Sequence, residues 1–317
     1  MDEKLMRSLI DPELLDNYDK SAGFDLRHLD TFKPACDKQE LANLKDDPDV
    51  HIYEKMIPGP EGAPDIKLRI YEPTDRTAEP LPCGMFFHGG GFLFGSVYRQ
   101  NDMCLRMCKN VNMVVVSVEY RLSPMYKAPA PIEDAYAALL WVDKNHNEIG
   151  IDNTKIAITG LSAGGCVTAA LALMTRDRKG PKPVLQIPLY AMLDHKADTC
   201  SQHAITSEKV WCYNYSKIAW DTYIEKGTEL NYYISPILAE DLSNLPPVFS
   251  FIGTVDPLLD ENIEYWNKLI RAGIPVEYHI FPGCYHSFEI AVPDSHYGKM
   301  AYNLMYSALR RAFGTEK

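Results

Sequence analysis

The feature that most constrains this chain is a serine placed between the patterns of a strand and a helix. Residues 155–159 read as a buried strand, and small residues at helical spacing continue to about residue 178. Between them, Gly160-Leu161-Ser162-Ala163-Gly164 matches G-x-S-x-G, whose glycines let neighbouring backbones approach closely. A sharp turn between strand and helix exposes the serine Oγ, so Ser162 is the candidate nucleophile.

Strand and helix patterns alternate over most of the chain. Such alternation favours parallel crossovers, so we expect an α/β fold with a mostly parallel twisted sheet flanked by helices. No strong strand pattern precedes residue 67, and residues 282–285 read as a loop. The expected strands are 67–71, 84–87, 113–118, 155–159, 184–189, 248–252 and 276–280, and the expected helices are 132–142, 163–178 and 263–272.

Two segments stand outside this alternation. Residues 1–50 are polar and interrupted by Pro12, and their charged part at 38–49 is expected to be exposed. Residues 194–233 are rich in aromatic side chains and read as inserted helices. We expect these two segments to form a helical cap over the main domain, which spans residues 51–317.

Composition excludes several classes of protein. The chain has 317 residues, a formal net charge of −11 and a hydrophobic fraction of 46%, which are typical of a globular domain. General nucleic-acid binding needs an excess of Lys and Arg, which this chain lacks. No run approaches the roughly 18 apolar residues of a membrane-spanning helix.

The eight cysteines are scattered, and we expect reduced thiols in a cytoplasmic protein. The chain starts Met1-Asp2-Glu3-Lys4, without the apolar stretch of a signal peptide. Cys104 and Cys108 stand four apart, but no further His or Cys completes a zinc spacing, so no metal site is expected. Cys166 and Cys284 lie close in sequence to candidate catalytic residues and are expected to be packing thiols.

The segment His88-Gly89-Gly90-Gly91-Phe92 ends an earlier strand. Three consecutive glycines cost conformational entropy, so something must require bare backbone at this place. One interpretation is an oxyanion hole built from the N–H groups of Gly90, Gly91 and Ala163. The alternatives are a flexible turn or a phosphate-binding loop. This segment lacks the Gly-Lys-Ser/Thr that a phosphate-binding loop contains. His88 is expected to brace the loop.

A serine needs a base, and the base needs an acid to fix its tautomer. His286 follows the strand at 276–280 and is the best candidate base among the nine histidines. Asp256 directly follows the strand at 248–252 and is the candidate acid. Asp260 is its rival and is otherwise expected to cap the next helix. The order Ser162, Asp256, His286 is that of an α/β-hydrolase.

These motifs resemble the hormone-sensitive-lipase-like group of α/β-hydrolases, which includes many carboxylesterases. The resemblance covers residues 50–317 and implies the triad and oxyanion donors named above, a helical cap, cleavage of short- to medium-chain acyl esters, and no metal or organic cofactor. It rests on His88-Gly89-Gly90-Gly91-Phe92, Tyr120-Arg121-Leu122-Ser123-Pro124, Glu133-Asp134-Ala135, Ser162-Ala163-Gly164-Gly165, Asp256-Pro257-Leu258-Leu259-Asp260-Glu261 and Pro282-Gly283-Cys284-Tyr285-His286-Ser287-Phe288.

The walls of the substrate pocket are harder to assign. The family usually has Asp where this chain has Leu161, which affects rate and preference more than the reaction. Leu161 and Phe92 are candidate substrate-binding residues beside the catalytic loops. Trp211, Tyr215 and Trp220 either line the pocket or anchor the cap, and the sequence does not choose between these roles. Arg121 with Asp134 is interpreted as a structural ion pair.

Several functions remain open on this triad. The first is a serine carboxylesterase acting on a small-molecule ester, and the second is a deacetylase of acylated sugars or an amidase. A non-catalytic ligand receptor of the same fold is disfavoured, since Ser162, Asp256 and His286 are all present. A homodimer paired through an edge strand is compatible with such a sheet, although no residue demands it.

Overall fold

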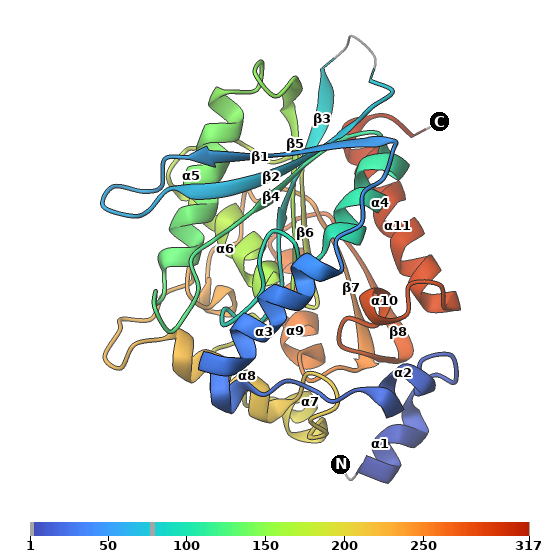
Figure 1. Ribbon diagram of the computed structural model, residues 1–317. Helices are drawn as coiled ribbons and strands as arrows, with labels where there is room; N and C mark the ends of the chain where they lie inside the picture. The colour runs from blue at the N-terminus through green and yellow to red at the C-terminus, as the bar shows by residue number, and fades with distance from the viewer. Residues whose placement is uncertain (1–2, 77–79, 317) are drawn as a thin grey trace.

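The computed structural model describes residues 3–76 and 80–316 and contains one eight-stranded sheet (Figure 1). The strand order is β1-β2-β4-β3-β5-β6-β7-β8, so β1 and β8 form the edges. β2 pairs antiparallel with β1 and β4, and every other neighbouring pair is parallel. The strands are β1 (Val50–Ile57), β2 (Ile66–Pro73), β3 (Leu81–Phe87), β4 (Val114–Val118), β5 (Ile151–Leu161), β6 (Leu185–Leu189), β7 (Val248–Val255) and β8 (Val276–Tyr285).

Helices cover both faces of this sheet. α4 and α11 pack together on one face, and α5 and α6 pack together on the other (Figure 1). The helices are α1 (Glu3–Leu9), α2 (Leu15–Lys20), η1 (Leu26–His28), α3 (Leu29–Ala42), α4 (Asn101–Val111), α5 (Ala130–Lys144), α6 (Ala163–Asp177), α7 (Cys200–Ala204), α8 (Tyr213–Tyr223), η2 (Pro236–Leu238), α9 (Leu259–Arg271), α10 (Phe288–Ala291) and α11 (His296–Phe313).

The central strands explain why the sequence favoured a parallel sheet. Every residue of β3, β4 and β6 is buried, as is expected of strands covered on both faces. Such strands appear in a sequence as continuous apolar runs, which is the pattern at 113–118. The α/β fold expected from the sequence, a mostly parallel sheet flanked by helices, is confirmed.

Two expectations about local structure are wrong, and the expected exposure of residues 38–49 fails at one residue only. β1 (Val50–Ile57) was not expected, and only its two end residues are buried because it lies at the edge of the sheet. β8 continues to Tyr285, so residues 282–285 belong to a strand that pairs with β7 after a shift in register. α3 extends through residues 38–42, and Glu40 in this stretch is buried by contacts with Ser96 and Arg99.

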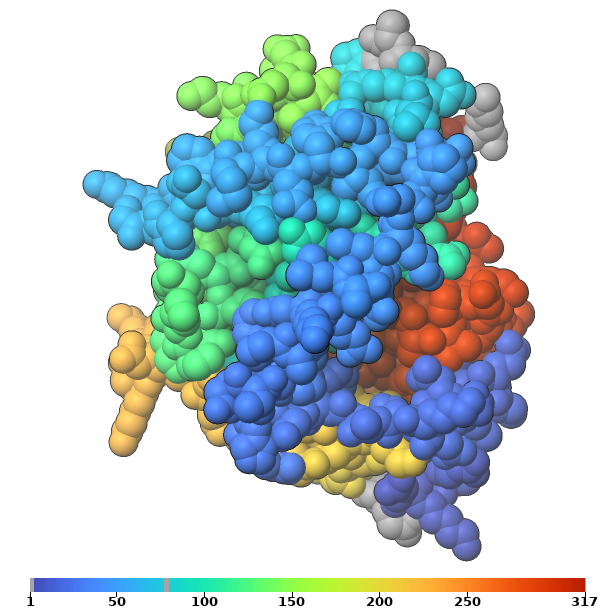
Figure 2. Space-filling model, viewed as in Figure 1, coloured from blue at the N-terminus to red at the C-terminus, as the bar shows by residue number. Residues whose placement is uncertain are grey.

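The N-terminal segment and the segment around α7 and α8 pack on each other although they are far apart in the sequence. Both lie at the lower end of the molecule in Figures 1 and 2. The Tyr18 hydroxyl donates to Ser207 Oγ at 2.9 Å, and Arg27 forms an ion pair with Glu208. The Phe24 ring lies 6.0 Å from the Trp211 ring between centroids.

Within residues 3–76 and 80–316, no helix combines the length and hydropathy of a membrane span.

Candidate active site

Ser162 occupies a strained turn between β5 and α6. β5 ends at Leu161, α6 begins at Ala163, and Ser162 between them has φ 57° and ψ −114°. A positive φ is unfavourable for a residue with a Cβ and is concentrated at functional sites. The Ser162 N–H donates to the carbonyl of Leu189 at the end of β6, which holds the turn in place. The strand–turn–helix context predicted for Ser162 is present.

The Ser162 hydroxyl has no hydrogen-bond partner among the described residues, although it is buried. A buried polar atom without a partner is costly, and in a native structure such an atom calls for a specific explanation. Ser162 lines a cavity of about 220 Å³ together with Gly90, Leu161 and His286. The hydroxyl is therefore available to a molecule that enters this cavity.

His286 and Asp256 are held together at the ends of adjacent strands. Asp256 follows β7, His286 follows β8, and their Nδ1 and Oδ2 atoms are 2.8 Å apart. The Asp256 side chain is fully buried, and its Oδ1 accepts from the Leu258 N–H. With Nδ1 bonded to a carboxylate, the Nε2 atom of His286 remains free to accept a proton.

Asp260 takes a different role from the rival acid considered above. It lies in the first turn of α9, where its Oδ2 accepts from the Ser201 N–H at 2.8 Å. It is not the cap of α9, since Leu258 occupies the position before that helix. Asp260 thus ties the start of α9 to the start of α7.

The glycine segment after β3 lies beside Ser162. Gly90 has φ +126°, and a Cβ there would come 2.0 Å from the Phe94 carbonyl oxygen. Gly91 has φ +60°, and its Cβ would come 2.5 Å from the Trp211 ring. No acceptor among the described residues takes the N–H of either glycine. Two backbone donors next to a nucleophile are what an oxyanion hole requires.

His88 braces this segment from inside the protein. Its Nδ1 lies 2.8 Å from the Gly89 carbonyl oxygen, and its ring stacks on Tyr120 with centroids 4.2 Å apart. The Tyr120 hydroxyl donates to the His88 carbonyl at 2.6 Å. Burial lowers the pKa of His88 to about 3, so the ring is neutral at ordinary pH.

The candidate pocket residues divide into two groups. Leu161 and Trp211 line the cavity that contains Ser162, and the Trp211 ring lies 5.9 Å from the His286 ring between centroids. Phe92, Tyr215 and Trp220 are not among the described residues that line it. The lining consists of Asn17, Ser21, Phe24, Gly89, Gly90, Phe94, Arg99, Gln100, Leu161, Ser162, Lys209, Val210, Trp211, Tyr285, His286, Ser287, Ile290 and Ala291.

Those three aromatic residues pack elsewhere. Phe92 stacks on Tyr223 with centroids 4.0 Å apart, and Trp220 lies 5.9 Å from the Phe92 ring. The Tyr215 hydroxyl accepts from the Phe24 N–H and donates to the Glu208 carbonyl. These contacts join the segment around α8 to the glycine segment and to the N-terminal segment.

Two residues of this site were missed by the sequence reasoning. The Tyr190 ring meets the His286 ring edge-on at 4.8 Å, and the Tyr190 hydroxyl donates to the Glu289 carboxyl. Glu289 is fully buried, three residues after His286. An acidic residue so close to the candidate base was a usable signal, whereas nothing in the sequence around Tyr190 distinguishes it from a core residue.

The described residues contain no group of three or more His, Cys, Asp or Glu side chains that could hold a metal ion. The Arg121 and Asp134 side chains form an ion pair at 2.7 Å, and the Asp134 carboxylate is fully buried. Asp134 also accepts from the Arg121 backbone N–H, so this pair fixes the chain just after β4.

Comparison with known proteins places this arrangement in a family. A family model described as alpha/beta hydrolase fold matches residues 84–290. The chain belongs to the α/β-hydrolase family. The match confirms the family expected from the motifs, and it includes the glycine segment, Ser162, Asp256 and His286.

Similar proteins have names that point to ester hydrolysis. This α/β-hydrolase is 34% identical over 241 residues to "Esterase LipI" of Mycobacterium tuberculosis, an alignment covering 73% of each chain. It is 34% identical over 228 residues to "Arylesterase" of Saccharolobus solfataricus, which covers 71% of this chain and 73% of the other. The solved structure "Bacterial Heroin Esterase" matches with a TM-score of 0.91 and 31% identity, covering 96% of this chain and 98% of the other.

Proposed function

We propose that this protein is a serine carboxylesterase in which Ser162 is the nucleophile, His286 the general base and Asp256 the acid that orients it. One observation carries the proposal. His286, whose Nδ1 lies 2.8 Å from Asp256 Oδ2, lines the same small cavity as a buried serine hydroxyl without a partner. The names of the similar proteins support the same reaction.

The proposed reaction is acyl transfer through a covalent intermediate. His286 takes the Ser162 proton on Nε2, and Oγ attacks the ester carbonyl carbon. The resulting imidazolium gives its proton to the leaving alcohol oxygen, which leaves an acyl-enzyme. Water then attacks the acyl carbon with His286 again as base, which releases the acid and restores Ser162.

The negative oxygen of both tetrahedral intermediates needs donors. We assign this role to the N–H groups of Gly90, Gly91 and Ala163. The first two belong to a segment braced by His88, and the third begins α6 beside Ser162. Donors fixed before the reaction lower the barrier because they need not reorganise when charge develops.

The size of the cavity favours small acyl and alcohol groups. Its volume is about 220 Å³. At about 30 Å³ for each water-sized group, it has room for roughly seven heavy atoms. We therefore propose short- to medium-chain acyl esters as substrates. Residues 1–50 and 194–233 act as a cap in this proposal, because Asn17, Phe24 and Trp211 close the cavity from these segments.

The state of the cysteine thiols indicates the cellular compartment in which the enzyme works. All eight are free, and seven of them are at least partly buried, with Cys200 the exposed one. Burial raises the pKa of the Cys166 and Cys284 thiols, which suits packing groups rather than nucleophiles. We propose a cytoplasmic enzyme on this ground.

The test is the Ser162→Ala variant assayed with 4-nitrophenyl acetate. We expect turnover to fall at least 10³-fold, because loss of a triad serine removes the covalent route. The melting temperature should stay near the wild-type value, since a buried hydroxyl without a partner contributes nothing by hydrogen bonding. Ser243→Ala, placed before the start of β7 and away from the cavity, is the matched control.

Two results would contradict the proposal. Retained turnover in Ser162→Ala would exclude Ser162 as nucleophile. Wild-type protein that turns over no ester would favour a ligand receptor instead. A panel of short acyl esters, acetylated sugars and anilides then separates ester hydrolysis from amide hydrolysis on the same triad and shows which alcohol groups the enzyme accepts.

A further inference from the structure

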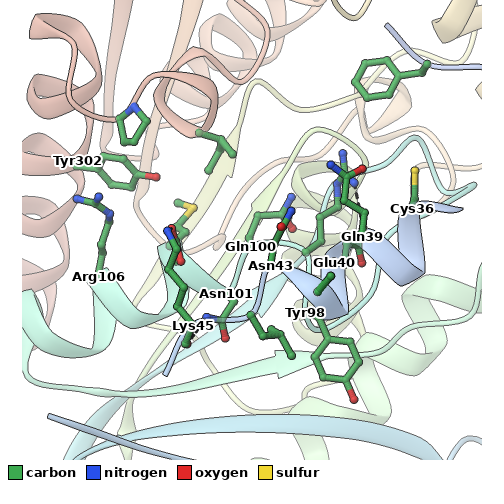
Figure 3. Close-up of a pocket in the computed structure, with 18 of the residues that line it drawn as sticks. Cys36, Gln39, Glu40, Asn43, Lys45, Tyr98, Gln100, Asn101, Arg106 and Tyr302 are labelled. Atoms are coloured by element: carbon green, nitrogen blue, oxygen red, sulfur yellow. Dashed lines mark hydrogen bonds and ion pairs between the residues drawn. The ribbon is translucent and has the colours of Figure 1, made fainter. Parts of the chain in front are cut away.

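We call the cavity lined by Ser162 and His286 the catalytic cavity. A second cavity, of about 760 Å³, adjoins it. It lies among α3, the chain from Tyr98 to Arg106, and Tyr302 of α11, and we call it the α3–α4 groove (Figure 3). Four residues line both the groove and the catalytic cavity, namely Phe24, Arg99, Gln100 and Ile290. The two spaces are thus separated by a wall of only four side chains.

The lining of the groove combines aromatic rings with hydrogen-bonding groups. Figure 3 shows Arg106 and Tyr302 at one end of the groove, Gln39 at the other, and Asn43 and Gln100 between them. Amide side chains offer both donors and acceptors, whereas aromatic faces cover apolar surface. This combination fits a ring that carries hydroxyl groups on its edge and C–H groups on its faces.

Two polar groups at the groove lack the partners that are usual for them. Gln100 is 8% exposed, and its Oε1 accepts no hydrogen bond from the described residues. Arg106 forms no ion pair within the described chain, and its guanidinium lies 5.6 Å from the Tyr302 ring centroid. Arg99, by contrast, is paired with Glu40 at 3.0 Å. A ligand hydroxyl could donate to Gln100 and accept from Arg106.

The alcohol half of an ester is the part that meets this wall. His286 must protonate the leaving oxygen, so the alcohol lies on the His286 side of Ser162. Ile290 follows His286 by four residues, in α10, and contributes to the wall between the two cavities. A substrate longer than the catalytic cavity would extend past Ile290 and Gln100.

We propose that the α3–α4 groove binds the alcohol part of the substrate, and that this part carries hydroxyl groups, as in an O-acetylated pyranose. The proposal rests on the proposed function and names the class of alcohol that the enzyme accepts. Gln100 is the acceptor for a ligand hydroxyl at the wall, and Arg106 is a donor farther along the groove.

The test compares two esters that share the acetyl group. One is 4-nitrophenyl acetate, and the other is methyl 6-O-acetyl-α-D-glucopyranoside. In Gln100→Met and Arg106→Met we expect kcat/KM for the glucoside to fall about tenfold more than for 4-nitrophenyl acetate, mainly through KM. Lys299→Met removes a positive charge from an exposed position on α11 outside both cavities and should not change the ratio.

The possible results distinguish failure of the groove proposal from failure of the proposed carboxylesterase function. Equal losses for both esters in the Gln100 and Arg106 variants would overturn the groove proposal, and so would a wild-type enzyme that cleaves 4-nitrophenyl acetate but not the glucoside. In both cases the proposed carboxylesterase function would stand. Loss of all ester turnover only in Ser162→Ala supports that function independently of the groove.

A separate observation concerns how His286 is held. Tyr190 directly follows β6 and has φ +33°, which is unfavourable for a residue with a large side chain. Its ring meets the His286 ring at an interplanar angle of 72°, and its hydroxyl donates to Glu289 Oε1 at 2.5 Å. The ring plane of Tyr190 is thereby fixed from both ends.

Glu289 is buried in a way that needs explanation. Its side chain is fully buried, and its Oε2 has no partner among the described residues. Burial raises its pKa to about 7, so below neutral pH the group is largely a neutral acid. The titratable groups around it are Tyr190 after β6, Asp256 after β7, Cys284 in β8 and Tyr302 in α11.

We infer that Tyr190 and Glu289 are positioning residues that hold the His286 ring in line with Asp256. Glu289→Leu and Tyr190→Phe should each lower kcat for 4-nitrophenyl acetate about tenfold with little change in KM. Glu289→Gln, which keeps an acceptor for the Tyr190 hydroxyl, should recover most of the loss. Its kcat–pH profile should lack an ionisation near pH 7 that the wild-type profile contains.

A purely structural role would give a different result. If Glu289→Leu lowers the melting temperature but leaves kcat and the pH profile as in the wild type, the inference is overturned. Tyr190→Phe keeps the buried ring and so remains informative if Glu289→Leu does not fold. Wild-type kcat and an unchanged pH profile in Tyr190→Phe would overturn it equally.

Discussion

Positive φ values in residues with side chains gather around the catalytic cavity. Phe92, Ser162, Tyr190 and Ser287 have φ of 63°, 57°, 33° and 61°. They lie in the segments that follow β3, β5, β6 and β8, where loops from parallel strands meet. Each such conformation costs on the order of 1–3 kcal/mol and persists only when the surroundings enforce it. The strain therefore marks loops that are fixed before a substrate arrives.

Gly90 gives the sharpest prediction at the scale of a single residue. In Gly90→Ala the new Cβ would come 2.0 Å from the Phe94 carbonyl oxygen, so the glycine segment must move. We expect kcat/KM for 4-nitrophenyl acetate to fall at least 10²-fold, because displacing one oxyanion donor typically costs that much. Stability should fall by roughly 2 kcal/mol or more, measured by urea unfolding.

Gly62→Ala separates steric displacement from backbone strain. Gly62 has φ +77°, and nothing lies within 4 Å of a Cβ added there. The variant should lose about 1–2 kcal/mol through the left-handed conformation alone and keep full esterase activity. Equal effects of the two substitutions on activity would contradict the assignment of Gly90 to the oxyanion hole.

At the scale of elements, the buried strands were predictable, whereas one edge strand was missed and the other was ended too early. The run at 113–118 identified β4 because a strand covered on both faces must be apolar throughout. β1 escaped prediction because it lies at an edge, where Glu54 and Lys55 can face solvent among apolar neighbours. β8 was ended too early at residue 280, since Pro282 and Gly283 read locally as a loop although pairing with β7 continues beyond them.

The same contrast applies to the site. The proposed triad residues Ser162, Asp256 and His286 were singled out because each comes shortly after a strand, which is a local pattern. The cavity walls depend on how α8 and the N-terminal segment pack, and no local pattern encodes that. Hence aromatic content singled out Trp211 and Trp220 alike, whereas only Trp211 lines the catalytic cavity.

We expect substitutions of the two tryptophans to have different effects, one on substrate preference and the other on stability. Trp211→Ala should enlarge the cavity beside Gly91, where the Trp211 ring lies, and raise the preference for hexanoyl over acetyl 4-nitrophenyl esters about tenfold, measured as a ratio of kcat/KM. Trp220→Ala should keep the wild-type preference, because its ring packs on Phe92 outside the cavity. It should instead cost about 3–5 kcal/mol in urea unfolding, as for other large buried aromatic residues.

If the Trp211 and Trp220 variants behaved alike, the distinction between a tryptophan that lines the cavity and one that does not would be contradicted. If both variants change the chain-length preference equally, the cavity wall extends beyond Trp211 to α8 as a whole. If neither changes it, the acyl group does not contact Trp211.

At the scale of the whole molecule, three carboxyl groups of this already acidic protein have a raised pKa. Burial raises the pKa of Glu261 to about 8 and that of Glu289 to about 7, and it raises the pKa of Glu119 as well. Glu261 accepts from the Leu193 and Asp194 N–H groups and so fixes the chain just before residues 194–233. These groups are protonated in the folded protein at a pH where the unfolded chain ionises them.

Stability should therefore fall as the pH rises towards 8. For each such group, the unfolded chain releases a proton that the folded protein keeps, which costs about 1.4 kcal/mol per pH unit. Below pH 6.5 the trend is opposed by His88, whose lowered pKa makes stability rise with pH between about 3 and 6.5. Between pH 6.5 and 8 the change in stability therefore comes from the buried glutamates, mainly from Glu261. We expect the free energy of unfolding to fall by roughly 2 kcal/mol over this range.

Glu261→Gln tests this expectation directly. An amide keeps an acceptor for the two backbone N–H groups. Its NH2 replaces Oε2, to which Gln202 Nε2 donates at 3.3 Å, so the Gln202 amide must turn to present its Oε1, which lacks a donor among the described residues. The variant should fold and should lose most of the decline in urea-unfolding free energy between pH 6.5 and 8. Glu240→Gln, at an exposed position, is the matched control and should keep the decline. A decline that persists in Glu261→Gln would mean that Glu261 is ionised in the folded protein, with its charge stabilised by Leu193, Asp194 and Gln202 against the cost of burial.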